Sequence, residues 1–173
     1  KMTQVNVFDS GVCSLGEGAL WHPTRNQFFW FDINNNALFS QEEGTRIRWD
    51  FDAHVTAAGW VNEDQLMIAH ETSLLLFNLK SRESEKIVDL EADDPITRSN
   101  DGRADPWGGF WIGTMGKKLE KDAGAIYRYY RGELRTLYSP WTIPNAQCFS
   151  PNRDFAYLTD TPNGEILRQR LDP

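Results

Sequence analysis

Three positions of the chain carry a carboxylate or carboxamide side chain six residues before a proline: Glu17, Asn100 and Asn145. A further unit lacks the proline, but aligning Trp60 with Trp21 places Thr56 at the same point. Carboxylate and carboxamide oxygens that converge in a wet cavity suit a hard divalent cation such as Ca²⁺, and also Mn²⁺ or Zn²⁺. The shared spacing therefore predicts a metal site assembled from separate parts of the chain.

The same residue types have a second interpretation. An Asn beside a strand is most often a turn residue that bonds its own backbone. Glu17 follows a glycine and would suit a solvated surface position. The agreement of spacing across three units favours the functional interpretation without deciding between the two.

The elements that must position these residues recur about every 40 to 45 residues, which is the period of a four-stranded propeller blade. Each unit has an aromatic residue, a polar turn and a short apolar run, at 28–33, 65–70, 110–115 and 155–160. Further strand candidates follow at 37–39, 74–79, 125–129 and 165–169, and in three units at 47–51, 86–90 and 134–138. No stretch keeps a helical period of apolar residues, so the sequence predicts almost no helix.

The sequence thus predicts an all-β propeller in a single domain, 1–173, with blade-like repeats at about 12–53, 54–97, 98–142 and 143–173. Because the first strand of each blade lines the central channel, side chains just before those strands would meet at one end of it. Three and a half to four blades cannot close a propeller. We therefore expect the remainder outside this chain, in a second chain or a C-terminal fragment.

Composition excludes several classes of partner. The formal net charge of -7 argues against nucleic acid and against an anionic membrane surface. No apolar run approaches the roughly 20 residues that cross a bilayer, and the N-terminus shows no apolar signal segment. Two cysteines, Cys13 and Cys148, are too few for a disulfide framework. These features predict a cytoplasmic protein.

Competing catalytic motifs are incomplete. His70-Glu71 begins a zinc-protease pattern, but Leu74 occupies the place of the second histidine. The stretch 100–105 has some features of a Ca²⁺ loop, yet its glycine is misplaced and no glutamate closes it. The chain has no nucleophile elbow and no glycine-rich phosphate loop.

Three longer motifs resemble the SMP-30/gluconolactonase/regucalcin family. They are Gly-Glu-Gly-Ala-Leu-Trp-His-Pro at 16–23; Arg-Ser-Asn-Asp-Gly-Arg-Ala-Asp-Pro at 98–106, followed by Gly-Thr-Met at 113–115; and Pro-Asn at 144–145, followed by Phe-Ser-Pro at 149–151 and Ala-Tyr-Leu-Thr-Asp-Thr at 156–161. The chain departs from the usual family pattern at Ala19, Ala146 and Phe149. The resemblance covers nearly the whole chain and implies a six-bladed propeller, of which this chain would supply about the first three and a half to four blades.

The resemblance also implies roles for individual residues. Glu17 and Asn145 would be ligands of one catalytic divalent metal ion (Ca, Zn or Mn), and Arg98 and Asn100 would hydrogen-bond a sugar lactone. The remaining ligand, an Asp that would also be the general base, would lie beyond Pro173, so the catalytic residue is unknown in this chain. Some members have a Glu two residues after Gly-Thr-Met, where this chain has Lys117, which puts substrate preference in doubt.

The implied function is metal-dependent hydrolysis of an aldonolactone, such as glucono-, arabinono- or xylono-lactone, to the sugar acid. A lactone is an ester, and a divalent metal can polarise its carbonyl or lower the pKa of a bound water. A neighbouring carboxylate then takes the proton of the water. The alternative is a non-enzymatic, Ca-binding regulatory propeller, and a third possibility is that this fragment is inactive alone.

Overall fold

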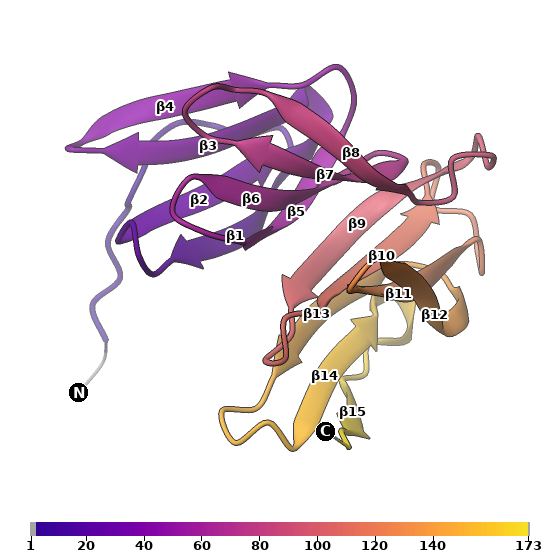
Figure 1. The fold of residues 1–173 in the computed structure, drawn as a ribbon. Coiled ribbons are helices and arrows are strands. Elements are labelled where there is room, and N and C mark those ends of the chain that lie inside the picture. Colours follow the sequence, from indigo (N-terminus) through magenta and orange to yellow (C-terminus); the bar gives the residue numbers. More distant parts are fainter. Residues whose placement is uncertain (1–2, 173) are drawn as a thin grey trace.

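The computed structural model describes residues 3–172, and antiparallel strands dominate it (Figure 1). Four sheets follow one another along the chain, and each is a simple meander. The first sheet contains β1 (Gly16–His22), β2 (Gln27–Asp32), β3 (Ala37–Glu42) and β4 (Thr45–Asp50). The second contains β5 (Val55–Trp60), β6 (Gln65–His70), β7 (Ser73–Asn78) and β8 (Ser84–Asp89). The third contains β9 (Thr97–Ala104), β10 (Phe110–Gly116), β11 (Gly124–Tyr130) and β12 (Glu133–Trp141), and the fourth β13 (Pro144–Phe149), β14 (Phe155–Asp160) and β15 (Leu167–Arg170).

The sheets form an arc with the first strand of each on its inner side (Figure 1). β5 lies against β1 and β9, and β9 also lies against β13. Between residues 3 and 172, helix is limited to two 3₁₀ turns, η1 (Ile33–Asn35) and η2 (Thr161–Asn163). The prediction of an all-β propeller with up to four blades in this chain is confirmed. Residues 1 and 173, the predicted ends of the domain, lie outside the described part.

The core consists of apolar layers between consecutive sheets. One layer joins the first two sheets through Phe29, Phe31, Leu38, Leu66 and Ile68, all fully buried. The next joins the second and third sheets through Leu74, Phe110 and Ile112, and the last joins the third and fourth through Trp111, Ile126 and Leu158. Burial of this apolar surface stabilises each sheet only against its neighbours, so the sheets hold one another in place.

The candidate residues lie within the innermost strands, not just before them as the sequence suggests. Glu17, Thr56 and Asn145 are each the second residue of an innermost strand, and Asn100 is the fourth residue of β9. Gly, Ser and Asn are uncommon in strands, so local preference favours a turn there. Pairing within the sheet and packing against neighbouring inner strands outweigh that preference.

Every innermost strand has a β-bulge beside its candidate residue. The pairing register shifts between Glu17 and Leu20 in β1, between Val55 and Ala57 in β5, between Ser99 and Gly102 in β9, and between Asn145 and Cys148 in β13. A bulge leaves extra residues unpaired and turns their side chains out of the regular alternation. The repeated spacing in the sequence thus corresponds to a repeated irregularity in the inner strands.

An N-terminal segment precedes the first sheet and lies across it. Phe8 makes edge contacts with Phe28 and Trp30, and Asp9 forms an ion pair of 3.4 Å with Arg46. Cys13 and Cys148 are free thiols. Over residues 3–172, the structure contains no helix with the length and apolar character of a membrane span.

Candidate functional site

The inner strands bring three of the four predicted site residues into one hydrogen-bond network. Arg98 Nη1 donates to Asn100 Oδ1 at 3.0 Å, and Asn100 Nδ2 donates to Asn145 Oδ1 at 3.4 Å. Asn100 is buried, and its Nδ2 also donates to the carbonyl of Pro144 at 2.9 Å. The network therefore joins β9 of the third sheet to β13 of the fourth.

The carboxamide of Asn145 has a defined orientation. Its Nδ2 donates to Thr161 Oγ1 at 2.7 Å, from the 3₁₀ turn that follows β14. This bond uses the nitrogen side of the amide, so Oδ1 is directed toward Asn100. An oxygen held in this way can coordinate a cation or accept a hydrogen bond from a substrate hydroxyl.

Glu17 lines a cavity of about 310 Å³ between β1, β9 and β13, which it shares with Asp101, Ala146 and Gln147. Burial raises the pKa of the Glu17 carboxyl, and the charge of Asp101 adds to this effect. The N–H of Gly18 and the charge of Arg98 act in the opposite direction. Glu17 thus faces a second carboxylate and lies within electrostatic reach of Arg98.

Asp101 is a site residue that the sequence reasoning missed. Its Oδ2 accepts the backbone N–H of Ala146 at 2.7 Å, and its Oδ1 accepts that of Gly102 at 2.9 Å. Burial raises its pKa, although these backbone bonds oppose the shift. The sequence feature that could have indicated Asp101 is its place directly after Asn100. The stretch that contains both residues was compared only with a complete Ca²⁺ loop, which it does not match.

Arg98 is partly buried beside this cavity. Burial lowers its pKa, while the carboxylates of Glu71 and Glu17 oppose the change. Its Nη1 donates to the carbonyl of Ser99 at 2.6 Å as well as to Asn100. Glu71 also forms an ion pair with Lys117, at the position where some family members have a Glu. Lys117 is therefore neutralised by Glu71 at the edge of the site.

Thr56, at the equivalent point of β5, is fully buried, and its hydroxyl bonds that of Ser99 at 2.9 Å. This contact joins β5 to β9 and occupies the side chain. Thr56 therefore supports the inner strands and does not extend the set of free oxygen donors.

The oxygen atoms of Glu17 and Asn145 are of the type that binds a hard cation, but they are few. Glu17 offers a carboxylate whose ionised form is disfavoured by its surroundings, and Asn145 offers an oriented amide oxygen. A nearby cation would offset the repulsion between Glu17 and Asp101. Within residues 3–172, however, no group of three or more His, Cys, Asp or Glu side chains is placed to hold a metal ion. The described residues therefore do not form a complete metal site by themselves.

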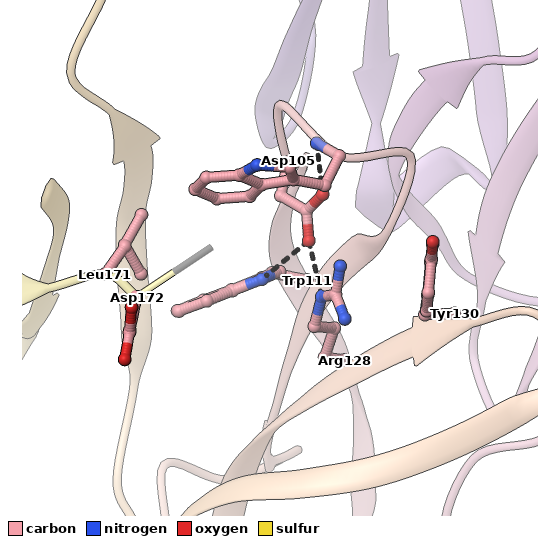
Figure 2. A pocket seen from close by; sticks show the side chains of 7 residues that line it. Asp105, Trp111, Arg128, Tyr130, Leu171 and Asp172 are labelled. Atoms are coloured by element: carbon pink, nitrogen blue, oxygen red, sulfur yellow. Dashed lines mark hydrogen bonds and ion pairs between the residues drawn. The ribbon is translucent and has the colours of Figure 1, made fainter. Parts of the chain in front are cut away.

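A second cavity, of about 380 Å³, lies between the third sheet and the last described residues (Figure 2). Asp105 at its wall accepts hydrogen bonds from Trp111 Nε1 at 3.2 Å and from Arg128 Nε at 2.5 Å. The same carboxylate accepts the N–H groups of Trp107 and Gly109. Because these bonds satisfy Asp105 and fix the turn between β9 and β10, this carboxylate is structural and leaves little capacity for a ligand.

The chain matches a known protein family. The family model for the SMP-30/Gluconolactonase/LRE-like region matches residues 15–173. A protein of Rhizobium meliloti (strain 1021) named "Putative sugar lactone lactonase" is 37% identical over 161 residues, which are 92% of this chain and 54% of that protein. A pentonolactonase of Haloferax volcanii is 30% identical over 182 residues, covering 99% of this chain and 58% of the relative.

Solved structures of similar proteins have the same fold. A calcium-binding protein, regucalcin, from Agrobacterium tumefaciens superimposes with a TM-score of 0.92 at 33% identity, over 95% of this chain and 56% of the solved chain. The chain therefore spans little more than half the length of the relatives it matches.

Proposed function

This chain belongs to the SMP-30/gluconolactonase/LRE-like family, and from that premise we propose that the protein hydrolyses a sugar lactone with the help of one divalent cation. Several relatives carry the names of lactonases, among them a pentonolactonase and an L-arabinolactonase. The observation that carries the proposal is the inner-strand network of Arg98, Asn100 and Asn145, with Glu17 in the adjoining cavity.

Glu17 and Asn145 would hold the cation. Their oxygens are the donors that Ca²⁺ and Mn²⁺ prefer, and they are also acceptable to Zn²⁺. A bound cation of this kind polarises a carbonyl or activates a water molecule, which is the chemistry that ester hydrolysis needs. The additional ligands and a general base would come from parts of the protein other than the described residues.

Arg98 and Asn100 would hold the lactone. The planar guanidinium of Arg98 can donate to two oxygens at once, a geometry that suits the ring and carbonyl oxygens of a lactone. Asn100 Oδ1 accepts one of these N–H groups, so it orients the guanidinium. With the substrate fixed in this way, a water molecule at the cation has a defined direction of attack.

The proposed substrate class is the aldonolactones, such as glucono-, arabinono- and xylono-lactone. Polyhydroxylated lactones suit a site whose described groups are amides, carboxylates and one arginine. Lys117 does not add a free positive charge to this site because Glu71 pairs with it. We therefore expect uncharged lactones to be preferred over phosphorylated ones.

The test uses the intact protein, depleted of metal with a chelator and then reloaded separately with Mn²⁺, Zn²⁺ and Ca²⁺. Hydrolysis of glucono-lactone would be followed through the acid released, using a pH indicator. We expect activity to disappear on chelation and to return with at least one metal. Tight Ca²⁺ binding without hydrolysis of any aldonolactone would favour the regulatory alternative instead.

A further inference from the structure

Asp101 shares the cavity of about 310 Å³ with Glu17, and the proposed function gives its carboxylate no role. It belongs to β9, which reaches Asn145 through the Asn100 side chain. Its carboxylate accepts a backbone N–H of the next sheet, from a residue 45 positions later in the chain. This bond crosses from the third sheet to the fourth at the point where the proposed ligand Asn145 lies.

Asn100 and Asp101 hold the backbone on both sides of Asn145. Asn100 Nδ2 donates to the carbonyl of Pro144, the residue before Asn145, at 2.9 Å. Asp101 Oδ2 accepts the N–H of Ala146, the residue after it, at 2.7 Å. Neither of these two bonds uses the side chain of Asn145, so together they fix its backbone. Its Oδ1 accepts a longer bond, of 3.4 Å, from the same Asn100 Nδ2.

The bulge in β9 makes this arrangement possible. In a regular strand, consecutive side chains point to opposite faces of the sheet, so two neighbours cannot both reach the same segment. Here Ile112 pairs with Gly102 and Thr114 with Ser99, which leaves only Gly113 opposite both Asn100 and Asp101. Because the bulge removes the alternation, both side chains reach β13.

Ala146 needs such a partner because its backbone is strained. Its φ of 62° lies in the left-handed region, where a residue with a Cβ is disfavoured and glycine is not. Gly18 occupies the equivalent position after Glu17 in β1, with a φ of 64°. The hydrogen bond from Ala146 to Asp101 therefore stabilises a conformation that β1 achieves with glycine.

We propose that Asp101 is a positioning residue, which holds the bulge of β13 and thereby fixes the position of Asn145 beside the cavity. This inference rests on the proposed function for the role of Asn145. It predicts that loss of Asp101 acts through residue 146. A glycine at position 146 should therefore compensate for the loss.

The test measures Mn²⁺ binding by calorimetry in the intact protein and in Asp101→Ala, Ala146→Gly and the double variant. We expect Asp101→Ala to weaken binding at least tenfold and Ala146→Gly to stay within threefold of wild type. The double variant should regain most of the lost affinity. The kcat of Asp101→Ala should also recover at saturating Mn²⁺ with an unchanged KM for lactone. Leu38→Val, at a fully buried residue of β3 in the first sheet, controls for general destabilisation and should not shift the Mn²⁺ dependence.

Two results would overturn the proposal. Wild-type affinity in Asp101→Ala would show that Asn145 needs no such support. A double variant that binds as weakly as Asp101→Ala would show that the carboxylate acts directly on the cation. The proposed activity fails separately, if the wild-type protein binds Mn²⁺ but hydrolyses no lactone.

Discussion

Glu17 illustrates how a site residue can oppose the stability of its own fold. Its carboxylate faces Asp101 across a shared cavity, and burial together with that charge raises its pKa. A raised pKa in the folded state means that the protonated form is favoured there. The contribution of Glu17 to stability is therefore present below its ordinary value of 4.5 and is lost as the pH rises through the folded pKa.

Replacement of Glu17 should separate function from stability. At neutral pH, Glu17→Gln removes the unfavourable charge, so the metal-free protein should melt at a slightly higher temperature than wild type. The same change removes the charge of the proposed metal ligand and should weaken metal affinity by at least about tenfold. Thermal melting with and without Mn²⁺ measures both effects, and Glu85→Gln on the exposed face of β8 is the control. An unchanged Mn²⁺ affinity would place the metal elsewhere.

Replacement of Arg98 should weaken catalysis on the substrate without weakening metal binding. Truncation in Arg98→Ala removes the charged donors that we propose bind the lactone, and we expect kcat/KM to fall on the order of 10- to 100-fold. Metal affinity should change little because Asn145 retains its bond to Thr161. Steady-state kinetics and calorimetry give the two quantities, with Arg98→Lys as the charge-preserving comparison. Loss of metal binding with normal kinetics for the lactone would reverse the roles.

At the scale of elements, the bulge is the recurring device of the inner strands. Glu17 and Asn145 are the last paired residues before a bulge. Thr56 and Asn100 lie unpaired inside one, where the regular alternation of side chains is lost. The bulge in β1 depends on Gly18, whose φ is 64°. A Cβ on Gly18 would lie 2.5 Å from the carbonyl oxygen of Thr56 and 2.6 Å from Phe31 Cδ2.

Gly18→Ala should therefore destabilise the protein in two ways, through backbone strain and through a steric clash. Gly44 is the matched control, because its φ is 78° and a Cβ there meets nothing within 4 Å. Strain alone should reduce the free energy of unfolding by about 1 kcal/mol in Gly44→Ala. The clash should add about 1–3 kcal/mol in Gly18→Ala. Urea unfolding of both variants gives the comparison, and equal losses would mean that β1 moves to accommodate the methyl group.

At the scale of the whole molecule, stability resides between the sheets. The three apolar layers each join one sheet to the next, and β5 and β9 contact inner strands on both sides. In such an arrangement each sheet is held in place by the apolar layers that it shares with its neighbours.

Ile112→Ala tests how much one of these layers contributes to stability. Ile112 is fully buried between the second and third sheets, and its truncation should reduce the free energy of unfolding by about 2–5 kcal/mol. Ile96, which is 45% exposed, is the control, and Ile96→Ala should lose less than about 1 kcal/mol. Denaturant unfolding measures both. Similar losses in the two variants would show that the layer is not closely packed.

The sequence alone determined the class of fold and the residue types of the site. Short apolar and aromatic runs with turn residues between them define the strands, and their recurrence about every 40 to 45 residues defines the repeats. The position of Glu17, Asn100 and Asn145 at one point of the repeat was likewise visible in the chain. These features depend on local order, which a sequence records directly.

Tertiary structure alone decided how the site is assembled. The innermost strands contain Gly, Ser and Asn, whose local preference is for turns, and only pairing with neighbours makes them strands. The bulges, the burial of Thr56 against Ser99 and the bond from Asp101 to Ala146 all depend on contacts between separate sheets. Asp101 therefore looked like a loop residue in the chain, because its partner lies 45 positions away. The left-handed backbone of Ala146 could not be inferred locally either, since an alanine is strained there and is held in place by the neighbouring sheet.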